Sequence, residues 1–188
     1  MNKKYALIVV DMVYDFTDPN GKIFYPLNVD LLPKIKDFIA EVRKYGVQII
    51  YMQHSVTKKM LEDSPKKTRE CCLVGTKGEQ IDERLEIRPE DLVIKKHKYS
   101  SFFETGLDQE LKNRGIDHII VAGTKTNNCV FATVLDAYNL NYHAFVPKEL
   151  VGTTDYETNG VYLRDMGKYL CEVMSDQEIL TRLQEGTL

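Results

Sequence analysis

Three side chains able to support nucleophilic chemistry each follow a predicted strand. Asp11 comes directly after the apolar run "LIVV", Lys96 ends "DLVIKK", and Cys129 follows "HIIVAG" across the polar turn "TKTNN". The carboxyl ends of parallel strands meet at one edge of a sheet, where open α/β sheets bind their ligands. A carboxylate that accepts a proton, an amine that stabilises charge and a thiol that attacks a carbonyl would therefore converge there.

Cys129 has the most informative local setting of the three. The sequence places its thiol in the first turn of a predicted helix, where the helix dipole and unpaired N–H groups favour the thiolate. The same N–H groups can form an oxyanion hole for a tetrahedral intermediate. The alternative is a small apolar core residue, and this is our interpretation of Cys71, Cys72 and Cys171, which follow no strand-to-helix turn.

The sequence alone leaves the other two residues open. Asp11 is either functional or an ordinary turn residue, because Asp15 and Asp18 crowd the same loop. The segment "KKHK" offers several lysines, of which Lys96 and its second neighbour share one face of a strand while Lys95 points to the opposite face. Taken alone, such a cluster favours a solvated surface.

The elements that must position these residues alternate between strands and helices. Apolar runs predict strands at 5–11, 47–53, 91–96, 117–123 and 142–147, and amphipathic patterns predict helices at 29–46, 105–115 and 127–138. Two helical patterns close the chain, with "CEVMS" as a further strand between them. This order predicts a three-layer α/β/α fold around a mostly parallel, six-stranded sheet. Residues 54–90 show no clear period, which favours a functional or flexible loop.

Composition limits the class of protein. The 188 residues, of which 43% are hydrophobic and 28% charged, suit a single domain over 1–188. A net charge of −3 gives no reason to expect a nucleic-acid or membrane partner. The N-terminal "MNKKYALIVVDM" is too short in its apolar part for a signal peptide, and the four cysteines lack C-x-x-C spacing, so we expect a cytoplasmic protein with reduced thiols.

Two segments of the chain together resemble a known family. The set "ALIVVDMVYDF" and "VIKKHKYSSFFETGLDQELKNRGIDHIIVAGTKTNNCVFATVLDAY" is similar to the isochorismatase-like cysteine hydrolases, over roughly residues 4–175. The resemblance implies an Asp-Lys-Cys triad of Asp11, Lys96 and Cys129. It selects Lys96 because the family lysine stands three residues before the aromatic of a "YSxF"-like segment, here "YSSF".

The resemblance also implies details of the nucleophile turn. A non-proline cis peptide bond maps to Thr124–Lys125, and the N–H groups of Lys125 and Cys129 would form the oxyanion hole. Asp11 would take the thiol proton, Cys129 would form a thioester as an amine or ammonia leaves, and water would then hydrolyse the thioester.

Two branches of the family differ near residue 54. Nicotinamidases bind a metal through a D-x-H pair, but this chain has His54 and Val56 there, so we expect no metal site and no cofactor. The segment "CCLVGTKGEQIDERL" instead resembles the N-carbamoylsarcosine amidase and ureidoacrylate or biuret hydrolase branch, although that branch often has tryptophan at position 77 and this chain has none. The resemblance makes five residues candidates for substrate binding: Phe16, Gln53, His54, Arg69 and Thr76.

These observations predict a cysteine-dependent amidohydrolase that cleaves a C–N bond of a small amide, carbamoyl or ureido compound. The alternatives are a nicotinamidase-like or isochorismatase-like hydrolase of another small metabolite, a ligand-binding pseudoenzyme, and a redox thiol protein that would need a resolving cysteine near Cys129. Family members usually assemble, so we expect a homo-oligomer, a dimer or tetramer.

Overall fold

A parallel sheet forms the centre of the protein. The computed structural model describes residues 3–66 and 70–188. In that part of the chain, the main strands are β1 (Tyr5–Val10), β2 (Gln48–His54), β3 (Leu92–Lys96), β4 (His118–Thr124), β5 (His143–Pro147) and β7 (Glu172–Met174). They lie in the order β3-β2-β1-β4-β5-β7, and every neighbouring pair is parallel. The predicted α/β class and its six strands are therefore confirmed.

A seventh strand was not predicted. β6 (Val151–Gly152) pairs with the end of β4, with Gly123 opposite Val151. Two residues are too few to produce a recognisable alternation, so the sequence carries no pattern for this strand.

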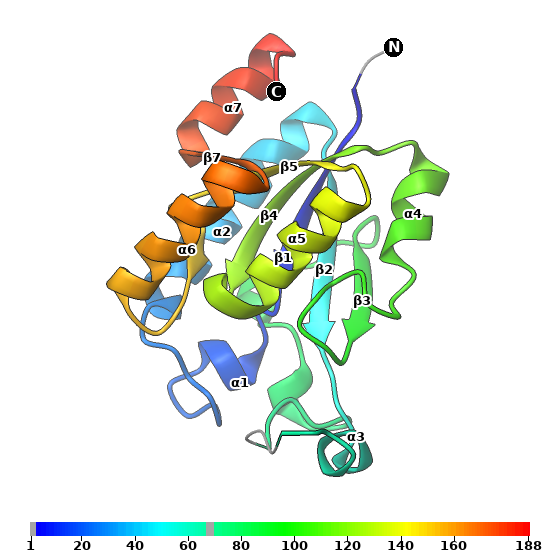
Figure 1. The fold of residues 1–188 in the computed structure, drawn as a ribbon, viewed down its shortest axis with the longest axis vertical. Coiled ribbons are helices and arrows are strands. Elements are labelled where there is room, and N and C mark those ends of the chain that lie inside the picture. The colour runs from blue at the N-terminus through cyan, green and yellow to red at the C-terminus, as the bar shows by residue number, and fades with distance from the viewer. Residues whose placement is uncertain (1–2, 67–69) are drawn as a thin grey trace.

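Helices cover both faces of the sheet (Figure 1). One face packs against α2 (Asn28–Val42) and α7 (Asp176–Glu185), and the other against α4 (Leu107–Arg114), α5 (Phe131–Asn139) and α6 (Tyr156–Tyr169). Alternation along β1 decides which side chains face which layer: Leu7 and Val9 join the α2 side, while Ala6 and Ile8 join the α5 side. Both faces are apolar, as expected for a sheet buried between two layers.

The region without a clear period contains short helices. These are α3 (Lys58–Glu62) and the 3₁₀ turns η2 (Lys77–Glu79) and η3 (Glu83–Leu85), and a further short helix, α1 (Tyr14–Thr17), follows β1. Thr57 caps the start of α3, where its hydroxyl accepts a hydrogen bond from the Met60 backbone N–H at 3.2 Å. In Figure 1, α1 and α3 lie beyond the arrowheads of the strands, at the edge of the sheet where the candidate residues were expected.

Helix ends differ little from the sequence prediction. α2 passes into the 3₁₀ turn η1 (Arg43–Tyr45) and stops at Gly46, whose positive φ of 72° suits glycine. The helix predicted at 127–138 begins as a π-helical turn, η4 (Thr126–Val130), and continues as α5 from Phe131. No helix in the described ranges is long and apolar enough to cross a membrane.

Candidate active site

A buried ion pair joins the ends of β1 and β3. Lys96 Nζ lies 2.7 Å from Asp11 Oδ2, and neither side chain is exposed. The Asp11 backbone N–H donates to the Met52 carbonyl at 2.9 Å, with a positive φ of 54° at Asp11. Lys96 Nζ also donates to the Lys98 carbonyl at 3.0 Å. The interpretation of "KKHK" as a solvated cluster is therefore wrong for Lys96.

The charge of Asp11 keeps Lys96 protonated. Burial on its own would lower the pKa of Lys96, but the neighbouring Asp11 carboxylate and Cys129 outweigh burial and raise that pKa overall. Two opposite charges that are both removed from water stabilise one another strongly, and removing either leaves the other uncompensated. The site thus holds a carboxylate and an ammonium together beside the thiol.

The turn that carries Cys129 packs closely against β1. A Cβ added to Gly123, which has a φ of 118°, would lie 2.1 Å from the Val10 carbonyl oxygen, so only glycine fits there. The Thr124–Lys125 peptide bond is cis, at the bond to which the resemblance points. The Lys125 carbonyl then accepts hydrogen bonds from Asn128 at 3.0 Å and Val130 at 3.1 Å, which closes the turn.

Burial dominates the ionisation of Cys129. The residue is 7% exposed, and desolvation, followed by the charge of Asp11, raises its pKa to about 12, although Lys96 acts in the opposite direction. The expectation that the helix start would favour a thiolate is therefore wrong for the resting protein. A π-helical turn stands in place of the expected α-helical first turn, and the enclosed thiol stays protonated.

A hydroxyl pair links the "YSSF" segment to the nucleophile turn. The Thr133 hydroxyl donates to the Cys129 carbonyl at 2.7 Å and accepts from the Ser101 backbone N–H at 3.0 Å. The hydroxyl groups of Thr133 and Ser101 lie 2.9 Å apart, and both residues are fully buried. Sequence reasoning missed this pair. Buried hydroxyls on a helix and a loop give no periodic signal.

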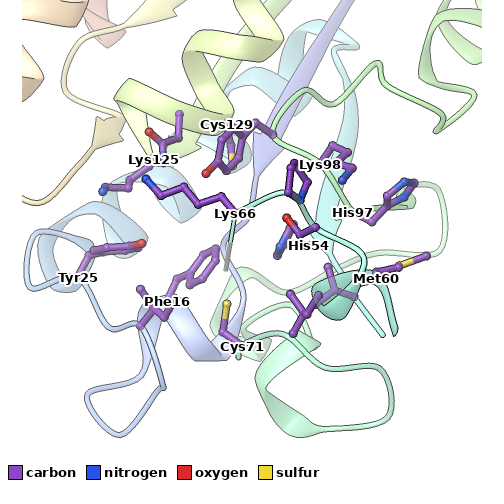
Figure 2. A pocket seen from close by; sticks show the side chains of 17 residues that line it. Phe16, Tyr25, His54, Met60, Lys66, Cys71, His97, Lys98, Lys125 and Cys129 are labelled. Carbon is purple, nitrogen blue, oxygen red and sulfur yellow. The ribbon is translucent and has the colours of Figure 1, made fainter. Parts of the chain in front are cut away.

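A cavity of about 430 Å³ opens beside Cys129 (Figure 2). It lies among the segment after β1, the end of β2, α3 with the residues after it, the segment after β3 and the nucleophile turn. Its described lining residues are Phe16, Ile23, Tyr25, His54, Val56, Met60, Leu61, Ser64, Pro65, Lys66, Cys71, His97, Lys98, Tyr99, Lys125, Asn128 and Cys129. This volume suits a small molecule.

The candidate substrate-binding residues divide into three groups. Phe16 and His54 line the cavity, with ring centroids 6.2 Å apart. Gln53 and Thr76 are not among its described lining residues, so their role in substrate binding stays a prediction. The Gln53 amide donates to the Glu79 carbonyl at 2.7 Å, and the exposed Thr76 hydroxyl donates to the Leu73 carbonyl at 2.7 Å. Arg69 lies outside the described residues.

Burial also sets the protonation of His54. Desolvation lowers its pKa to about 4, so the ring is neutral near pH 7. Its Nδ1 atom is buried and has no hydrogen-bond partner in the described protein. Cys71, which the sequence left as a core residue, also lines the cavity.

Glu79 fastens the 71–85 segment to the strand ends. Its carboxylate accepts hydrogen bonds from the Ser55 hydroxyl, from the Gly75 N–H at 2.8 Å and from Lys95 Nζ at 3.2 Å. Glu79 is 6% exposed, a burial that the polar sequence around it does not predict. Lys95 thus points away from the site, as the strand alternation indicated. In the described ranges, no three His, Cys, Asp or Glu side chains gather where they could hold a metal ion.

Curated proteins similar in sequence to this chain include amidohydrolases. Curated relatives include the ureidoacrylate amidohydrolase RutB of Enterobacter sp., which is 30% identical over an alignment of length 165 that covers 75% of this chain and 72% of that protein. The same enzyme of Rhizobium rhizogenes is 28% identical over an alignment of length 162 that covers 73% of this chain but only 65% of that protein. This chain thus spans less than two thirds of that relative's length.

Solved structures share the fold. A cysteine hydrolase from Pseudomonas syringae pv. phaseolicola superposes with a TM-score of 0.88 at 25% identity, covering 97% of this chain and 93% of that one. The nicotinamidase PncA of Bacillus subtilis gives 0.84 at 22% identity, covering 92% and 99%. The isochorismatase domain model matches residues 5–178. With this match over nearly its whole length, the chain belongs to the isochorismatase family of hydrolases.

Proposed function

We propose that the protein is a cysteine amidohydrolase that cleaves the C–N bond of a small amide, carbamoyl or ureido compound. One observation carries this proposal: the Cys129 thiol stands at a small cavity beside a fully buried Asp11–Lys96 ion pair. The similarity to proteins named ureidoacrylate amidohydrolases supports this choice of bond.

The first half of the reaction makes a thioester. Asp11 accepts the Cys129 proton as sulfur attacks the carbonyl carbon, while Lys96 stabilises the charges on both groups. The oxyanion is held by the backbone N–H groups of Lys125 and Cys129. The C–N bond then breaks, and Asp11 returns the proton to the departing nitrogen as ammonia or an amine leaves.

The second half regenerates the thiol. Asp11, again a carboxylate, takes a proton from water as the water oxygen attacks the thioester carbonyl. The carbon–sulfur bond breaks, and the proton returns to Cys129 while the acid product leaves. Overall, one amide and one water give one acid and one amine or ammonia, with no external oxidant or reductant.

The experiment is a release assay with matched cysteine variants. Purified protein is incubated with small amides, N-carbamoyl amino acids, alkyl ureas and nicotinamide, and ammonia is measured. We expect release from at least one ureido or amide substrate, loss of that release in Cys129→Ala, and its retention in Cys171→Ala. Turnover that survives Cys129→Ala would overturn the proposal.

Nicotinamide stands in the same panel because nicotinamidases share the fold. Their likeness, at 22% identity for the Bacillus subtilis protein, concerns the fold alone. Turnover of nicotinamide above every ureido compound would favour this alternative, in which the role of Cys129 is unchanged and the substrate class differs.

A further inference from the structure

A second pair of reactive side chains adjoins the cavity. Cys71 lines the cavity, as Cys129 does, and the neighbouring Cys72 is fully buried behind it. Figure 2 shows Cys71 on the side of the cavity opposite Cys129. The reaction proposed above uses neither Cys71 nor Cys72, although one of the two thiols opens onto the space that a substrate would occupy.

The thiols of Cys71 and Cys72 contact each other. A hydrogen bond joins them, and because it lowers the pKa of Cys71 and raises that of Cys72, the Cys72 thiol is the donor. Adjacent side chains on a strand point to opposite faces, but the positive φ of 52° at Cys72 breaks that alternation. The Cys72 backbone is fixed on both sides, since its N–H donates to the Asp15 carboxylate and its carbonyl accepts from the Val56 N–H at 3.0 Å. The fold thus holds two sulfur atoms side by side on a fixed backbone.

This arrangement suits a bridging atom better than a direct disulfide. Neighbouring Cα atoms lie about 3.8 Å apart across a trans peptide bond, such as the one between Cys71 and Cys72. Disulfides usually join residues whose Cα atoms are about 4.4–6.8 Å apart, so a bond between these two sulfurs would be strained. One atom bonded to both sulfurs spans a longer distance than a sulfur–sulfur bond, and it therefore closes a larger, less strained ring.

The surroundings of the pair limit the kind of atom that fits. Thiolates are ligands for soft centres. In the described ranges, no three His, Cys, Asp or Glu side chains gather as ligands, so the pair offers two protein ligands and no third. A trivalent organoarsenical needs only two, because its third bond is to its own carbon. Phe16 and Ile23 pack with the two cysteines and line the cavity, so an apolar organic group would lie against apolar side chains.

We propose that Cys71 and Cys72 form a dithiol site that binds trivalent organoarsenicals, with the organic group in the cavity beside Phe16 and Ile23. In this reaction an arsenic oxide, R–As=O, forms two arsenic–sulfur bonds. Its oxygen leaves with the two thiol protons as one water molecule, and nothing is oxidised or reduced. The bound organic group fills space in front of Cys129. Binding itself does not depend on the proposed amidohydrolase activity.

The first test maps the bound thiols in the unaltered protein. Reduced protein is mixed with phenylarsine oxide, its intact mass is measured, and the remaining thiols are alkylated with N-ethylmaleimide in denaturant. We expect one adduct equal in mass to phenylarsine oxide less one water, with two of the four cysteines protected from alkylation. Peptide mass should identify them as Cys71 and Cys72. Protection of Cys129 or Cys171 in place of either residue would overturn the proposal.

The second test uses matched cysteine variants. Cys71→Ser and Cys72→Ser should each bind phenylarsine oxide about 100-fold more weakly or less, because a single thiol loses the gain from joining two binding events. Cys171→Ser is the control, since Cys171 packs with the α5–α6 side of the sheet, and it should bind like the parent protein. Thermal unfolding shows whether each variant folds, and thiol mapping of the unaltered protein decides the question if one does not. Parental affinity in Cys71→Ser/Cys72→Ser would contradict the assignment.

The third test places the organic group. Burial of a phenyl ring against apolar side chains should make phenylarsine oxide bind at least about 10-fold more tightly than inorganic arsenite, which has no such group. Equal or tighter binding of arsenite would refute this placement. 2,3-Dimercaptopropanol should release the adduct at concentrations where 2-mercaptoethanol does not, and equal release by both would contradict a two-thiol site.

The Cys129→Ala protein separates this proposal from the proposed function. It should bind phenylarsine oxide with parental affinity whether or not the parent protein hydrolyses any amide. Loss of binding in Cys129→Ala would overturn the dithiol site and leave the amidohydrolase proposal standing. Absence of turnover together with intact binding would remove the proposed function alone.

Discussion

Replacing Asp11 by Asn should move two properties of Cys129 in opposite directions. Burial and then the charge of Asp11 raise the pKa of the Cys129 thiol to about 12, while Lys96 acts to lower it. Asp11→Asn removes the negative charge, so the thiol pKa should fall. The same change removes the group that accepts the thiol proton, so turnover should fall as well.

The size of the effect follows from the pKa. A thiol with a pKa of about 12 is ionised in roughly one molecule in 10⁵ at pH 7, which corresponds to about 7 kcal/mol for loss of its proton to solvent. A positioned general base contributes a factor of about 10² to 10⁴ to the rate. Asp11→Asn should therefore lower kcat at least about 100-fold although the thiolate becomes more accessible. Lys96→Met, by contrast, should raise the thiol pKa.

The assay follows the pH dependence of Cys129 alkylation by iodoacetamide, with the modified peptide identified by mass, beside kcat for the same variants. Asp11→Asn leaves the Lys96 ammonium buried without its partner, which can cost about 3–5 kcal/mol of stability. Thermal unfolding is therefore recorded for each variant, and Asp11→Asn/Lys96→Met serves as a neutral control. An alkylation pKa that rises in Asp11→Asn, or a kcat within 10-fold of the parent protein, would refute the reasoning.

Three further predictions concern residues around the cavity. The pKa of His54 falls from 6.5 to about 4 on folding, so the unfolded state binds more protons between these pH values. The free energy of unfolding should therefore fall by roughly 3 kcal/mol from pH 7 to pH 4. In urea titrations, His54→Gln should remove this pH-dependent fall. Glu79→Gln should destabilise the protein by about 1–3 kcal/mol, because a buried acceptor for the Ser55 hydroxyl is altered. Lys95→Met should lower the free energy of unfolding less, because the Lys95 side chain is 56% exposed. Equal losses of stability for the two variants in chemical denaturation would contradict this. The hydrogen bond with Cys72 lowers the pKa of Cys71, whereas burial raises that of Cys129, so iodoacetamide at pH 8 should label Cys71 first. Peptide mass analysis follows the order of labelling. Labelling of Cys129 before Cys71 would contradict these two pKa shifts.

The sheet and its helices could be predicted because their signals are local. The apolar runs at β1 and β4 and the periodic pattern of α2 are properties of consecutive residues, and topology then follows from the alternation of strands and helices. β6 and η4 lack such a signal, because one is two residues long and the other differs from an α-helix only in its hydrogen bonding.

The site was predictable in part for the same reason. Asp11, Lys96 and Cys129 follow strands, and strand ends lie together wherever the sheet is parallel. Whether Lys96 is buried, however, depends on the carboxylate that meets it from two strands away, which no local pattern contains. Thr133, Glu79 and the cavity lining come from separate loops and helices, so only the folded chain brings them together.

The most direct measurement looks for the covalent intermediate. The protein is mixed with its best amide or ureido substrate, quenched in acid within the first turnovers, and its intact mass and Cys129 peptide are determined. We predict a mass increase equal to the acyl part of the substrate, located on Cys129, lost with time as acid product appears, and absent from Cys129→Ala. Steady turnover with an unmodified Cys129 at every quench time, or an adduct on Cys71 alone, would contradict nucleophilic catalysis by Cys129.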